Sequence, residues 1–217
     1  MGSIKPLIHL VKDNESTDLQ RFESLLALTN LASVDDETKS KIVSEKGIHV
    51  FHLAMFSDHN MVRRAATEAM SNLLPHDDML THLKDPSHLK LWIAFATDVQ
   101  ENMECSRAAT GCLAMASSDV DIAIALGEAT HFEDMITTLL QCGNLEIMHR
   151  LLVMLYNLTL HGASCQQEIT KTGAYAFLER YIQSYKDGNH DLGMTQLEVT
   201  QLMTTVDLAK EILRIIT

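Results

Sequence analysis

Apolar residues recur at three- and four-residue spacing along most of the chain, which is the spacing of one face of an α-helix. Leu25, Leu28 and Leu31 show this spacing within one segment. The pattern predicts an all-α protein whose helices span 5–12, 17–33, 36–46, 48–57, 59–74, 76–84, 87–98, 101–117, 119–127, 130–141, 144–161, 164–171, 174–186 and 194–216.

Three of these helices carry an asparagine in similar apolar surroundings. The segments are LLALTNLAS (25–33), AMSNLLP (69–75) and LYNLTL (155–160), with Asn30, Asn72 and Asn157 as their amides. Asn72 follows Asn30 by 42 residues, Met115 follows Asn72 by 43, and Asn157 follows Met115 by 42. Self-similarity at this period predicts an α-solenoid of the armadillo or HEAT type.

Other positions follow the same register. A basic residue lies seven to nine positions before each of these four positions: Arg21, Arg63 and Arg64, Arg107, and Arg150. Residues suited to helix starts, where free backbone N–H groups favour oxygen acceptors, precede the long helices: Asp18, Asp58, Glu101 and Asn144.

The segments between the long helices indicate two further helices per unit. A short helix is followed by a glycine and then by a second helix, with Gly47 and Gly173 expected to supply the turns. Three helices per unit, the first one short, favour the armadillo pattern over the two-helix HEAT pattern. We therefore expect a right-handed superhelical armadillo-repeat solenoid of about four to five repeats.

The ends of the chain suggest its domain organisation. Residues 1–3 read as an expression scar, and 4–217 as one armadillo-repeat domain. The segment 4–13 resembles a second helix whose unit lacks its first, so we expect a fragment of a longer chain. The last helix is longer than the others, so it either caps the array or packs against something absent.

Composition and charge narrow the class of partner. The 217 residues carry a net charge of −12, which disfavours nucleic acid and anionic membranes as partners. The four cysteines form no CxxC pair, so we interpret them as packing residues in a reducing cytoplasm. The chain contains no secretory signal peptide and no apolar stretch long enough to span a bilayer.

Three segments together resemble one family. LQRFESLLALTNLAS (19–33), MVRRAATEAMSNLLP (61–75) and RAATGCLAMASS (107–118) are similar to the C-terminal region of UCS-domain proteins, the chaperones of myosin motor domains. The resemblance implies a cytoplasmic, muscle-related armadillo domain whose concave groove engages unfolded or partly folded myosin heads. In the animal branch of the family, an N-terminal tetratricopeptide domain recruits the ninety-kilodalton heat-shock chaperone. This chain has no such segment, so client binding alone is expected of it.

The third helices of stacked armadillo units line one concave face, where side chains at the same helical phase form a row. An asparagine amide offers two donors and an acceptor, so it can hold the backbone of an extended client. The same helical face supplies neighbours at four and seven or eight positions before each amide and before Met115, and His161 four positions after Asn157. The candidate groove residues are Glu23, Leu26, Asn30, Arg64, Glu68, Asn72, Arg107, Gly111, Arg150, Val153, Asn157 and His161.

A second interpretation of these rows is structural. A repeated asparagine can bond a carbonyl of the neighbouring unit and set the stacking, since buried amides need partners. The arginines can form ordinary surface or inter-repeat ion pairs. Both interpretations stay open at the level of sequence.

No pattern of a catalytic or metal site is found. His49 and His52 lie three apart, but no acidic residue or cysteine follows at zinc-ligand spacing, and HExxH, P-loop and nucleophile-elbow motifs are absent. We expect no catalytic residue, no cofactor and no metal, and therefore a non-enzymatic protein.

The alternative function is an armadillo adaptor that binds an extended peptide of a folded partner. Nuclear-signal receptors of that fold pair a tryptophan with an asparagine four residues later. Trp92 has Ala96 at that position, which disfavours this version of the adaptor.

Overall fold

The computed structural model describes residues 2–186 and 194–217, and every regular element within them is an α-helix. All fourteen predicted helices are present there, with ends displaced by at most three residues. They are α1 (Ile4–Lys12), α2 (Asp18–Ala32), α3 (Asp36–Ser44), α4 (Gly47–Ala54), α5 (Asn60–Asn72), α6 (Asp77–Lys84), α7 (Pro86–Thr97), α8 (Met103–Ala116), α9 (Val120–Gly127), α10 (Phe132–Gln141), α11 (Leu145–Leu160), α12 (Ala163–Lys171), α13 (Ala174–Lys186) and α14 (Gln196–Ile216).

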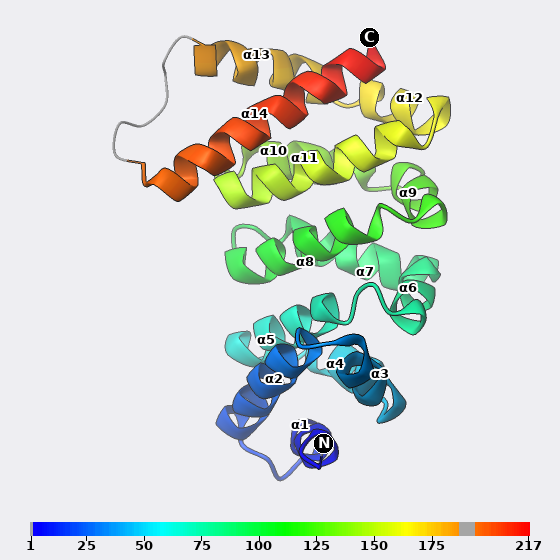
Figure 1. The fold of residues 1–217 in the computed structure, drawn as a ribbon, viewed down its shortest axis with the longest axis vertical. Helices are drawn as coiled ribbons and strands as arrows, with labels where there is room; N and C mark the ends of the chain where they lie inside the picture. The colour runs from blue at the N-terminus through cyan, green and yellow to red at the C-terminus, as the bar shows by residue number, and fades with distance from the viewer. Residues whose placement is uncertain (1, 187–193) are drawn as a thin grey trace.

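The helices form successive three-helix units, as the repeat predicted. A partial unit, α1–α2, is followed by four units: α3–α5, α6–α8, α9–α11 and α12–α14. The third helices pack on one another in order, α2 on α5, α5 on α8, α8 on α11 and α11 on α14, so they stack along the length of the molecule (Figure 1). The predicted armadillo-type solenoid is thereby confirmed, and α14 packs on α11 as the third helix of the last unit.

Local sequence explains where the long helices begin. Thr17 and the side chain of Gln20 form a reciprocal capping box at the start of α2. Asn102 accepts a hydrogen bond from the Cys105 N–H at α8, and Asn144 caps α11 in the same way. The predictions of Asp58 and Glu101 as helix starts were wrong by one residue, because His59 and Asn102 occupy the capping positions.

The two predicted glycine turns need correction. At the α3–α4 turn the left-handed residue is Lys46, with φ 66°, and Gly47 is the first residue of α4. A Cβ on Gly47 would lie 2.5 Å from Ile42 Cγ2 and 2.7 Å from Ile42 O, so this glycine permits a close approach of helices. Gly173 has neither a left-handed φ nor a neighbour within 4 Å of an added Cβ.

One apolar core runs through all the units. Trp92 and Phe51 are its largest fully buried side chains. Of the four cysteines predicted to pack, Cys105, Cys112 and Cys165 are buried and Cys142 is half-buried. Burial raises the pKa of the Cys112 thiol to about 12. Among the described helices, none combines the length and apolarity needed to cross a membrane.

Candidate functional site: the third-helix face

The helices α2, α5, α8 and α11 follow one another along the molecule, and we call their solvent-exposed sides together the third-helix face (Figure 1). On α2 the side chains of Glu23, Leu26 and Asn30 are all exposed, at the four- and seven-residue spacing of one helical stripe. Met115 on α8 is 51% exposed and Leu26 is 37% exposed. Apolar side chains are thus open to solvent on this face at two separate units.

A hollow of about 480 Å³, which we call the central hollow, lies across four helices of this face. Thr29 of α2 borders it, and most of its lining comes from α5, α8 and α11. The predicted groove residues in its lining are Glu68, Asn72, Arg107, Gly111, Arg150 and Val153, together with Met115. The predicted residues outside it are Glu23, Leu26, Asn30, Arg64, Asn157 and His161. A larger hollow of about 700 Å³, near α1 and α4, contains none of the predicted groove residues.

Two of the three asparagine side chains form a hydrogen bond to the preceding unit. Asn72 Nδ2 donates to Thr29 O of α2 at 3.1 Å, and Asn157 Nδ2 donates to Ala114 O of α8 at 3.1 Å. Both carbonyls lie in the last turn of a third helix, where carbonyl groups lack intrahelical partners. Each amide therefore caps the neighbouring helix, which agrees with the stacking interpretation.

The row of amides is not continuous. Asn30 is exposed and makes no side-chain hydrogen bond to another residue in the described part of the chain. In the α6–α8 unit, Met115 occupies the position that carries an asparagine in α2, α5 and α11, and its thioether has no hydrogen-bond donor. His161 Nε2 lies 3.3 Å from Ser117 O, at the junction that Asn157 also bridges.

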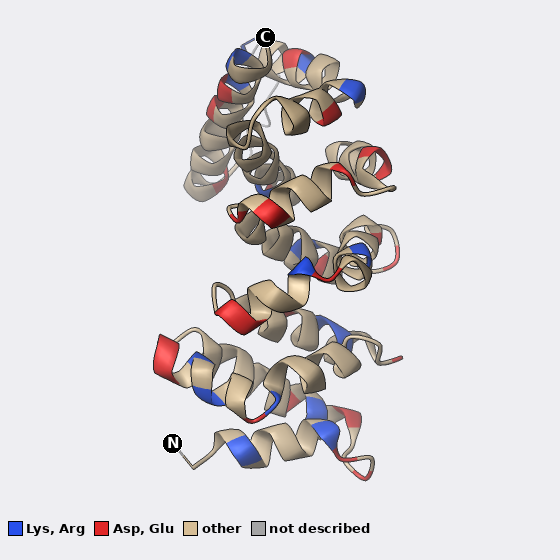
Figure 2. Ribbon diagram, turned by 90° about the vertical axis from the view of Figure 1, so that its right-hand side faces the viewer, with Lys and Arg blue, Asp and Glu red and all other residues tan. Residues whose placement is uncertain are grey.

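An ion-pair network crosses three units of the face. Its members are Arg64, Glu68, Glu104, Arg107, Glu146 and Arg150. Arg107 contacts Glu146 at 3.0 Å, Glu104 at 3.2 Å and Glu68 at 3.5 Å. Three guanidinium groups face three carboxylates, so the network is balanced in charge. Both acidic and basic residues are also distributed along the length of the molecule (Figure 2).

Burial and the neighbouring carboxylates have opposite effects on the pKa values of the arginines in this network. Burial disfavours the charged form of Arg107, but the hydrogen bond and charge of Glu146, with Glu104 and Glu68, outweigh it and raise its pKa. Burial lowers the pKa of Arg150. A Cβ on Gly111 would lie 2.9 Å from Arg150 Nη1, so Gly111 leaves the space that this guanidinium fills.

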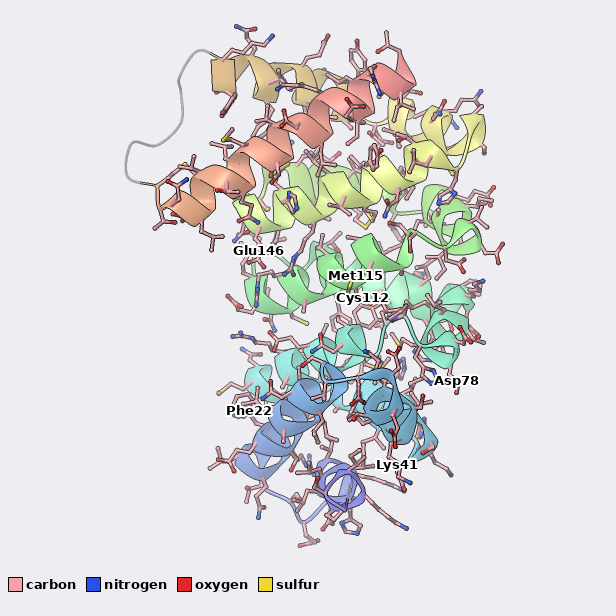
Figure 3. The ribbon with its side chains drawn as sticks, viewed as in Figure 1. Phe22, Lys41, Asp78, Cys112, Met115 and Glu146 are labelled. Carbon is pink, nitrogen blue, oxygen red and sulfur yellow. The ribbon has the colours of Figure 1, made fainter. Side chains whose placement is uncertain are left out.

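Glu104 and Glu146 were absent from the sequence-based candidates. Each lies one turn before an arginine of its own helix, three residues before Arg107 and four before Arg150. That spacing of opposite charges is a recognisable helical signal. Glu146 lies at the start of α11 and Met115 near the end of α8, on the near side of the molecule in Figure 3.

Replacing Asn72 with alanine is expected to lower the melting temperature by about 2–4 °C, because the variant loses one inter-unit hydrogen bond of about 1 kcal/mol. Thermal unfolding followed by circular dichroism measures this change. Asn30→Ala is the matched control, since Asn30 occupies the equivalent position on α2 and is exposed. Equal melting temperatures for the two variants would show that the Asn72 bond contributes nothing to stacking.

Comparison with known proteins shows which proteins this chain is similar to. No protein-family model matches the chain. The chain is 32% identical over 159 residues to protein unc-45 homolog B of Xenopus tropicalis. The aligned part covers 71% of this chain and 17% of the relative, so the chain spans less than a fifth of that protein.

Solved structures give the same picture. UNC-45 from Drosophila melanogaster superposes with a TM-score of 0.82 at 23% identity, over 98% of this chain and 25% of that one. The myosin chaperone UNC-45 from C. elegans, solved with an Hsp90 peptide, gives 0.73 at 25% identity, over 94% and 22%. A designed armadillo repeat protein bound to the peptide (KR)4 gives 0.75 at 17% identity, over 96% and 82%. The chain belongs to the UCS-domain family of the UNC-45 proteins.

Proposed function

We propose that this chain is a non-enzymatic chaperone module that binds partly folded segments of a myosin motor domain on its third-helix face. The observation that carries the proposal is the exposure of Leu26 and Met115, with Met115 lining the central hollow together with the ion-paired Arg107. The family includes a relative named as a myosin chaperone, which supplies the client class.

The chemistry of the face suits an unfolded client better than a single fixed sequence. A methionine thioether adapts its shape to different apolar side chains. The arginines and glutamates of the ion-pair network satisfy one another, so a client need not supply a matching charge. The second N–H and the Oδ1 of Asn72 can pair with client backbone while Nδ2 keeps its bond to Thr29. The twelve predicted groove residues are our proposed contact surface.

Suppression of thermal aggregation of a myosin motor fragment tests this function. We expect light scattering to fall when the chain is present at near-stoichiometric amounts, because bound apolar segments cannot associate with one another. An equal mass of serum albumin controls for non-specific protection.

The adaptor alternative predicts a different outcome of the same experiment. An adaptor that reads an extended peptide of a folded partner would leave the aggregation of the motor fragment unchanged. Unchanged scattering at a several-fold molar excess of the chain would overturn the chaperone proposal.

A further inference from the structure

Three histidines from three different helices meet on the side of the solenoid formed by the first and second helices. They are His52 of α4, His82 of α6 and His88 of α7, and one ring nitrogen of each lies within 4.8 Å of the others. The His82 and His88 rings stack with centroids 3.7 Å apart, and His52 contacts both edge-on. None of them belongs to the third-helix face.

The hydrogen bonding of the three rings is incomplete. His88 Nδ1 lies 2.9 Å from His82 O, and because a carbonyl only accepts, Nδ1 carries the proton and Nε2 keeps a lone pair. His52 Nδ1 and His82 Nε2 are buried and have no hydrogen-bond partner among the described residues. Buried polar atoms without partners are uncommon in folded proteins and call for an explanation.

We propose that His52, His82 and His88 form a binding site for a divalent transition-metal ion of the zinc class. Neutral imidazole nitrogens are ligands for zinc, copper and nickel, whereas calcium and magnesium prefer oxygen. Three histidines with water as the fourth ligand is an established zinc coordination.

Metal binding requires the stacked His82 and His88 rings to turn, because their planes differ by 16° and the ion must lie in the plane of each imidazole. Zinc–nitrogen bonds of about 2.0–2.1 Å at tetrahedral angles place ligand nitrogens about 3.4 Å apart. One ring nitrogen of each histidine lies within 4.8 Å of the others, so the nitrogens would have to approach further by rotation of the side chains. The His88–carbonyl hydrogen bond is the kind of outer contact that orients a metal-bound imidazole.

A metal at this position would join two consecutive units. His52 lies in the α3–α5 unit, while His82 and His88 lie in the α6–α8 unit. Because the three rings converge only in the folded chain, the ion would bind the native state and stabilise that junction. We expect the melting temperature to rise by about 5–10 °C at free zinc a hundredfold above the dissociation constant.

Zinc titration of the chelator-stripped chain, by calorimetry and by thermal unfolding, tests the site. We expect one ion per chain, and affinity weakened by more than about 10–100-fold in His52→Gln and in His88→Gln. His49→Gln is the matched control, one turn earlier on α4 and exposed, and it should bind as the wild type does. The melting temperature of each variant, measured in the presence of a chelator, establishes that the variant folds.

Cobalt(II) supplies a readout that does not depend on any variant. Bound to the wild-type chain, it should give the intense visible absorption of a tetrahedral site with nitrogen ligands. Absence of that absorption, or of saturable one-to-one zinc binding, would overturn the proposal. Equal affinities for the His49, His52 and His88 variants would also overturn it, since the ion would then be bound elsewhere.

Discussion

Replacing Trp92 with alanine is expected to lower the free energy of unfolding by about 3–5 kcal/mol. The indole is fully buried in α7, within the core of the α6–α8 unit. Its Nε1 has no hydrogen-bond partner among the described residues, so truncation removes apolar contacts and leaves a cavity without stranding a partner. Urea unfolding followed by far-ultraviolet circular dichroism measures the loss.

Two controls separate this core effect from a general one. Trp92→Phe keeps most of the volume and should cost less than the alanine variant. Leu53→Ala removes a side chain that is 57% exposed on α4, and should change the free energy by at most about 0.5 kcal/mol. A Trp92→Ala variant as stable as Leu53→Ala would contradict the core described here.

Much of this fold could be predicted because its information is local. Helical spacing of apolar residues identified all fourteen helices, and the 42- and 43-residue intervals fixed the register of the units. The register then predicted which side chains share a face. Glu68, Asn72, Arg107 and Arg150 accordingly line one hollow although they come from three helices.

Contacts between units were harder to predict, because they depend on how helices are oriented against one another. The sequence left open whether Asn72 binds a client or the neighbouring unit, and only the structure shows its bond to Thr29 O. The sequence predicted that Gly47 forms a turn. The structure shows instead that Ile42 of the preceding helix lies so close that it leaves no room for a Cβ at this position.

The histidine cluster shows the same limit more clearly. His49 and His52 are three residues apart, which is a spacing found in metal sites. The histidines that contact His52 in the structure are thirty and thirty-six residues away in the sequence. Zinc-ligand spacing within one segment cannot reveal a site assembled from three helices of two units. The expectation of no metal was based on such local motifs alone.

Replacing Met115 with glutamate is expected to weaken binding of a myosin motor domain by about 30-fold or more, corresponding to about 2 kcal/mol. Met115 borders the central hollow, and a carboxylate there would have to be desolvated when a client covers it. Because the side chain is 51% exposed in the free chain, the melting temperature should stay within about 2 °C of the wild type. Calorimetric titration measures the affinity.

Val120→Glu is the matched control for this substitution. Val120 is 49% exposed, close to the value for Met115, but it lies on α9, the first helix of its unit and outside the third-helix face. The two variants add the same charge to the same chain, so a general effect of charge on association would weaken both equally.

The most direct test of the central claim, that the third-helix face binds the client, is the affinity of one motor domain for the wild type, Met115→Glu and Val120→Glu. We predict that Met115→Glu alone loses affinity while all three proteins keep the same melting temperature. Equal affinities for all three proteins, or equal losses in the two variants, would place client binding away from the third-helix face.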